Sequence, residues 1–76
     1  MEEILLIFGQ RLKELRKGKG LKQTDMAEIM GITDRHYQRF EYGKVNVPAT
    51  TLAFFADYFS VTTDYLLGRS DSPAPK

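Results

Sequence analysis

Cysteine is absent from the 76 residues, and histidine occurs once. Without cysteine the chain can form neither a disulfide framework nor a thiolate metal site, and one isolated histidine does not make a metal centre. Long apolar stretches are also absent. No apolar run exceeds five residues, and the one near the start, from Ile4 to Phe8, is too short for a membrane span or a signal-peptide core. We therefore expect a cytoplasmic protein with no metal, cofactor or membrane partner.

The composition is that of one small globular domain. Apolar residues make up 42% of the chain and charged residues 28%, which argues against a disordered protein. A chain of this length buries only about 60% of its unfolded surface, so its core must be economical. We assign residues 1–68 to the domain. The polar, proline-containing residues 69–76 are predicted to form a flexible tail or the start of a linker.

The net charge of +1 is small, but its distribution is uneven. Residues 9–47 contain nine lysines and arginines against five acids, whereas the rest of the chain contains two against five. Such an imbalance is typical of a protein with one side that faces nucleic acid. Ordinary solvated helix faces would also produce it, so the charge alone leaves both interpretations open.

Apolar residues recur at helical spacing along the chain, and we predict an all-α fold of five helices. The expected helices lie near residues 3–17, 23–30, 34–42, 49–59 and 63–67. Gly31 can take the left-handed conformation that ends a helix, and Thr33 and Thr62 can cap the helices that follow them. Pro48 is suited to the start of a helix.

The segment from Gln23 to Gly43 is expected to fold into two short helices joined by a tight corner at Gly31. On the second helix, a turn of about 100° per residue places Tyr37 and Phe40 on the inner side. The outer side carries Asp34, Arg35, Gln38, Arg39 and Tyr42. This outer side is rich in hydrogen-bonding groups, and it suits the edges of base pairs in a major groove.

This segment resembles the helix-turn-helix of the lambda repressor-like family, of the Cro/repressor or Xre type. The matching residues of the corner are Gln23, Ala27, Gly31, Tyr37 and Phe40. Outside it the resemblance extends to Leu12, Leu15, residues 41–44, Pro48 and residues 61–67. It implies a compact five-helix domain that binds double-stranded DNA sequence-specifically. It further implies a transcriptional regulator, foremost a repressor, that binds a two-fold operator as a homodimer.

The resemblance also implies which residues contact DNA. The residues expected to read bases are Asp34, Arg35, Gln38 and Arg39. The resemblance implies phosphate contacts for Gln23, Lys44 and Asn46. Lys22 stands where the family usually has Ser, Thr or Asn, and its expected phosphate contact rests instead on its place at the N-terminus of a helix. Asp34 has a second interpretation, because a carboxylate also stabilises the positive N-terminus of a helix.

An ion pair between two helices is implied in the same way. In the family, a glutamate at the position of Glu41 pairs with an arginine at the position of Arg16. We therefore expect a partly buried Arg16–Glu41 pair that holds the 34–42 helix against the first helix.

Two apolar surfaces are candidates for a contact between subunits. Phe54 and Tyr58 form a second apolar face on the 49–59 helix, and we interpret this face as a candidate dimer surface. The run from Ile4 to Ile7 holds more apolar residues than one helix face can bury. Its outer residues are either simply exposed or in contact with a second subunit, and both interpretations stay open.

Other classes of function are weaker. The acids are scattered over solvent faces and His36 has no nucleophile at a suitable spacing, so we expect no enzyme and no small-molecule ligand. A protein-interaction module, antitoxin-like or part of a scaffold, could keep this fold with weak or no DNA binding. The small net charge, Asp34 and the Phe54–Tyr58 face favour that alternative, whereas the two outer arginines oppose it. A steep loss of DNA affinity with salt would distinguish the two.

Overall fold

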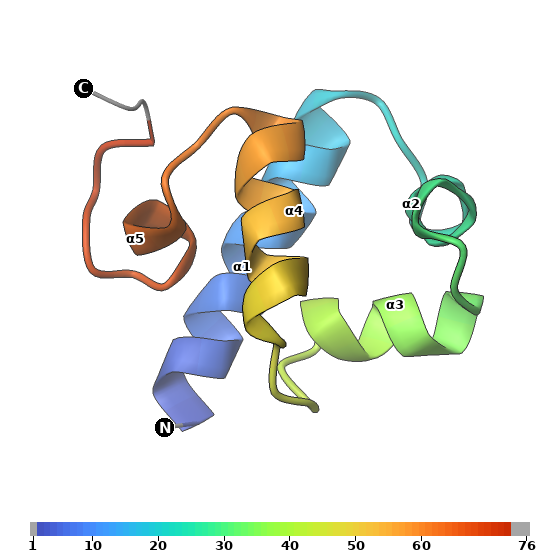
Figure 1. Ribbon diagram of the computed structural model, residues 1–76, viewed down its shortest axis with the longest axis horizontal. Coiled ribbons are helices and arrows are strands. Elements are labelled where there is room, and N and C mark those ends of the chain that lie inside the picture. The colour runs from blue at the N-terminus through green and yellow to red at the C-terminus, as the bar shows by residue number, and fades with distance from the viewer. Residues whose placement is uncertain (1, 74–76) are drawn as a thin grey trace.

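The computed structural model describes residues 2–73, which contain five helices and no strand (Figure 1). The helices are α1 (Glu2–Gly18), α2 (Gln23–Met30), α3 (Asp34–Glu41), α4 (Ala49–Phe59) and α5 (Thr63–Leu66). The predicted all-α, five-helix fold is confirmed. Within the described range, no helix combines the length and the apolar character needed to cross a membrane.

Short-range interactions set several of the helix ends. Gly31 follows α2 with a φ of 69°, in the left-handed conformation expected of it. The Thr33 side chain accepts a hydrogen bond from the backbone N–H of His36 at 3.1 Å, and this cap begins α3. In the same way, Thr62 accepts from the N–H of Tyr65 at 3.0 Å and begins α5. These predicted caps are confirmed.

The start of α2 lacks a capping side chain, because Lys22 occupies the N-cap and a lysine offers only donors. Asp25 partly compensates: its carboxylate accepts a hydrogen bond from the backbone N–H of Lys22 at 2.8 Å. This is the second half of a capping box, and it holds the entry to α2 without an acceptor at the N-cap.

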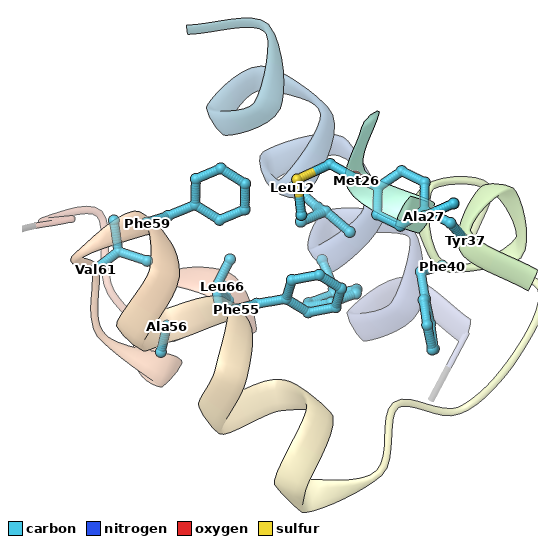
Figure 2. Close-up of a cluster of buried hydrophobic side chains, with 11 residues drawn as sticks. Leu12, Met26, Ala27, Tyr37, Phe40, Phe55, Ala56, Phe59, Val61 and Leu66 are labelled. Atoms are coloured by element: carbon cyan, nitrogen blue, oxygen red, sulfur yellow. The ribbon is translucent and has the colours of Figure 1, made fainter. Parts of the chain in front are cut away.

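The core lies where all five helices meet (Figure 2). Phe55 of α4 lies among three other buried aromatic rings, with centroid distances of 5.7 Å to Phe8, 6.4 Å to Tyr37 and 5.8 Å to Phe40. The buried apolar residues are Phe8, Leu12, Met26, Ala27, Tyr37, Phe40, Phe55, Ala56, Phe59, Val61 and Leu66. Because two of these residues come from α3, the core fixes both its position and its rotation.

The backbone of α3 lies directly against α1 at Gly9. A Cβ atom added to Gly9 would lie 2.2 Å from the carbonyl oxygen of Glu41 and 2.9 Å from that of Phe40. No side chain fits between the two backbones at this point. Glycine at position 9 is therefore what permits the close crossing of α1 and the C-terminal end of α3.

The segment after α5 is tied back to the domain by Arg11 of α1. The Arg11 guanidinium donates to the carbonyl oxygens of Tyr65 at 2.5 Å and Ser70 at 2.7 Å, and it lies 3.3 Å from the carboxylate of Asp71. It also stacks over the Tyr65 ring, 4.2 Å from the centroid. Part of the segment expected to be a flexible tail is thus hydrogen-bonded to α1, and residues 74–76 of that tail lie outside the described residues.

Candidate nucleic-acid interface

The outer face of α3 is polar and open to solvent. Asp34, Arg35 and Arg39 are exposed, Gln38 is half-buried, and Tyr42 at the end of the helix is 52% exposed. The opposite face of α3 carries the buried Tyr37, Phe40 and Glu41. The described part of the C-terminal segment runs beside α5 at the left of Figure 1, whereas α3 lies at the lower right. The outer face of α3 is therefore not covered by that segment.

The cations on and around this face have no acidic partner among residues 2–73. The ion pairs of the described chain are Arg11–Asp71, Arg16–Glu41 and Arg69–Asp64. Arg35 and Arg39 lie four residues apart on one helix, where like charges repel each other by a few tenths of a kcal/mol. This uncompensated positive charge favours an anionic partner.

A buried hydrogen-bond network holds α3 on the side opposite its outer face. Oε2 of Glu41 accepts from Nε of Arg16 and from the hydroxyl of Tyr37, both at 2.5 Å. Oε1 of Glu41 accepts from Nη2 of Arg16 at 3.2 Å and from Nε2 of Gln23 at 3.0 Å. Arg16 also donates to the carbonyl oxygen of Leu21 at 2.7 Å. One carboxylate therefore joins α1, α2 and α3.

Burial and hydrogen bonding act in opposite directions on this carboxylate. Burial raises the pKa of Glu41, but hydrogen bonds from Arg16, Tyr37 and Gln23 outweigh it and hold the pKa below its ordinary value. The hydrogen bond to Glu41 is also the main cause that raises the pKa of Arg16. Burial, together with the hydrogen bond to Glu41, raises the pKa of the Tyr37 hydroxyl. The folded state thus keeps Glu41 ionised and Tyr37 neutral.

The lowered pKa of Glu41 makes the domain acid-sensitive. The unfolded chain takes up a proton at Glu41 near pH 4.5, whereas the folded chain does so only at lower pH. The contribution of ionised Glu41 to the stability of the fold is therefore complete above about pH 4.5, and it is lost as the pH falls through the pKa of Glu41 in the folded chain. In thermal melts between pH 7 and pH 2, we expect Glu41→Gln to show a flatter acid dependence than the unchanged protein. The exposed Glu14→Gln is the matched control, and an equal flattening in it would contradict this assignment.

The residues expected to contact phosphates lie at the two ends of the helix-turn-helix, at the start of α2 and after α3. Lys22 is exposed at the N-cap of α2, and Lys44 and Asn46 are exposed in the loop that follows α3. Gln23 is half-buried and donates one amide hydrogen to Glu41. A second hydrogen on the same nitrogen remains for another acceptor. Its bond to Glu41 was not anticipated from the sequence.

Comparison with known proteins decides the family. The model of the helix-turn-helix family matches residues 12–66, which include all of α2 and α3. This chain belongs to the lambda repressor-like helix-turn-helix family. The family is one of transcriptional regulators and not of enzymes. No solved structure matches the chain significantly.

Several curated relatives from Bacillus subtilis (strain 168) share this helix-turn-helix. The chain is 41% identical to the SPbeta prophage-derived uncharacterized regulator YonR over 61 residues, which are 80% of this chain and 56% of YonR. It is 36% identical to the uncharacterized regulator YobD over 70 residues, 92% of this chain and 62% of YobD. It is 33% identical to the regulator ImmR over 64 residues, 84% of this chain and 50% of ImmR. All three are named HTH-type transcriptional regulators, and the chain spans between half and two thirds of their length.

The apolar residues outside the helix-turn-helix are exposed to different degrees. Phe54 and Tyr58 are half-buried and stack on each other, with ring centroids 5.7 Å apart and planes 19° apart. At the N-terminal end of α1, Leu6 is 57% exposed, Ile4 40% and Ile7 39%. The larger exposed apolar surface thus lies on α1, and the Phe54–Tyr58 pair is partly used in packing within the domain.

Proposed function

We propose that this helix-turn-helix domain binds double-stranded DNA with sequence preference and regulates transcription. The observation that carries the proposal is the outer face of α3, where Arg35 and Arg39 are exposed and have no acidic partner in the described chain. Arginine pairs in two hydrogen bonds with O6 and N7 of guanine. A helix of this width fits the major groove, and the core fixes which face of α3 is presented.

Contacts to the phosphate backbone supply most of the affinity in this proposal. Lys22 and Gln23 stand at the N-terminus of α2, where backbone N–H groups and the helix dipole favour an anion. Lys44 and Asn46 are exposed in the loop after α3, and in this proposal they contact a second stretch of backbone. Such contacts position the domain without reading the sequence. Binding should therefore weaken steeply as salt is added.

The proposal includes a homodimer on a two-fold operator, because one domain of this size offers limited contact area. The two half-sites would lie about 34 Å apart, one turn of the double helix, on the same face of the DNA. The candidate dimer surface is the Phe54–Tyr58 pair. Repression would follow from steric exclusion of the polymerase, and selection of binding sites from a random DNA pool tests both DNA binding and two-fold symmetry.

Arg35 and Arg39 can be separated from the phosphate-contacting residues by substitution. Replacing either arginine with alanine is expected to cost about 1–3 kcal/mol of preference for the selected operator over random DNA. Lys44→Ala is the matched control, because loss of a phosphate contact should weaken binding to both DNAs about equally. Titrations of both DNAs at fixed salt measure the two effects. An equal loss on operator and random DNA for both arginine variants would make them phosphate contacts.

A protein-interaction module remains the second candidate. The observation that favours it is the exposed apolar end of α1, with Leu6 at its centre, together with the acidic Asp34 on the outer face of α3. A domain of this kind should show no measurable association with mixed DNA even at low salt. A DNA reader should bind mixed DNA at low salt and lose affinity steeply as salt rises.

A further inference from the structure

Asp34 is the one acid on the outer face of α3, and its side chain makes no capping hydrogen bond to the helix. The backbone N–H of His36, which needs a cap, already donates to Thr33. The Asp34 side chain is exposed and has no hydrogen bond or ion pair within residues 2–73. Its carboxylate is therefore free to face whatever α3 binds.

A carboxylate only accepts hydrogen bonds, and this limits what it can face in a major groove. Phosphates, the N7 and O6 atoms of guanine and the O4 atom of thymine are acceptors and repel it. The amino group of cytosine is a donor. Adenine also offers an amino group, but the neighbouring N7 acceptor suits an amide, which both donates and accepts. Of the four bases, cytosine is thus the one that Asp34 fits.

The arginines on the same face have the opposite limitation, because they only donate. Guanine is the base that presents two acceptors side by side to a guanidinium. Four residues along a helix rise about 6 Å, more than one base-pair step of about 3.4 Å. Arg35 and Arg39 are therefore far enough apart to face different base pairs, and Asp34 lies one residue before Arg35.

We propose that α3 reads a half-site built on G·C pairs, with guanines facing Arg35 and Arg39 and a cytosine amino group facing Asp34. This inference rests on the proposed function and deepens it by naming the bases. Asp34 acts as a specificity-determining residue in two ways. It accepts from cytosine at the correct site, and it lowers affinity for all other DNA because it repels phosphates and acceptor atoms.

The test is a selection of binding sites from a random DNA pool by the unchanged chain, by Asp34→Asn and by Asp57→Asn. Asp57 is an exposed acid of α4, so the control makes the same chemical change away from α3. We expect Asp34→Asn to change one selected cytosine to adenine, by about tenfold in preference, because asparagine pairs with adenine through N6 and N7. The guanines and the other positions should stay the same. Affinity for random DNA should rise several-fold in Asp34→Asn, and the control should match the unchanged chain in base preference.

The possible outcomes separate the two proposals. If the unchanged chain selects a motif and Asp34→Asn selects the identical motif, Asp34 does not read a base and the inference is overturned, while the proposed function stands. A selected motif without guanines would overturn the inference in the same way. If the unchanged chain selects no sequence at all, the proposed function itself fails. Circular dichroism of each variant before selection shows that all three carry the same helical fold.

Discussion

Replacing Gly9 with alanine is expected to destabilise the domain by about 3 kcal/mol or more. In an isolated helix the same change would stabilise, since alanine is favoured over glycine by about 1 kcal/mol. Here the new methyl group would lie 2.2 Å from the carbonyl oxygen of Glu41, closer than Cβ atoms lie to neighbours in real structures. The clash is with backbone on both sides, so no side-chain rotation relieves it. α1 and α3 must move apart, and Phe8 and Phe40 lose their packing.

Gly18 provides the matched control for this prediction. It is the last residue of α1, and a Cβ atom there would meet nothing within 4 Å. Gly18→Ala should therefore leave stability unchanged or raise it slightly. Denaturant unfolding followed by circular dichroism measures both variants under the same conditions. A Gly9→Ala protein as stable as the unchanged chain would show that the two helices do not cross this closely.

The second large effect is expected from Glu41→Ala. Removing one partner of a buried ion pair costs about 3–5 kcal/mol, because the remaining charge stays buried without compensation. In this domain the remaining charge is Arg16, whose side chain is 8% exposed. The Tyr37 hydroxyl and the Gln23 amide would lose their acceptor as well. A domain of this size has a total stability of the same order, so we expect the variant to be largely unfolded at 37 °C.

A double substitution tests whether the cost comes from the orphaned charge. Replacing Arg16 with methionine and Glu41 with leucine together removes both charges and fills similar volume. Exchanges of buried ion pairs for apolar residues are often neutral or stabilising, so the double variant should be more stable than Glu41→Ala. Urea titrations of the three proteins give the comparison. If Glu41→Ala unfolds at the same urea concentration as the unchanged chain, the network contributes little.

The end of α2 and the start of α4 could be predicted to the residue because strong local features mark them. Gly31 ends α2, Pro48 precedes α4, and both act through their own backbone chemistry. The end of α3 was expected at Tyr42 and lies at Glu41, with Tyr42 as the C-cap. Differences of one residue at helix ends are ordinary, because the last turn loosens gradually.

Contacts between distant parts of the chain were harder to predict. The pattern placed Tyr37 in the core as an apolar residue, but the hydrogen bond of its hydroxyl to Glu41 depends on how α1 and α3 cross. The same crossing explains Gly9, which reads as a mildly unfavourable helix residue in the sequence alone. Arg11 meets residues 54 to 60 positions later in the chain, and its partners are mostly backbone carbonyl groups. Every residue has a backbone carbonyl group, so a hydrogen bond to one cannot be recognised from the identity of the residue that supplies it.

The three-helix network around Glu41 also has a thermodynamic consequence. The network joins α1, α2 and α3 in the free domain, so α3 is already folded before a partner binds. Binding therefore carries no conformational-entropy cost for ordering α3. Segments that fold as they bind show heat-capacity changes equivalent to burying an additional 1,000–3,000 Å² or so. In calorimetry of binding to this domain, the heat-capacity change should therefore be that of burying the interface alone, with no added contribution from folding of α3. A close fit to a partner is then expected without rearrangement of α3.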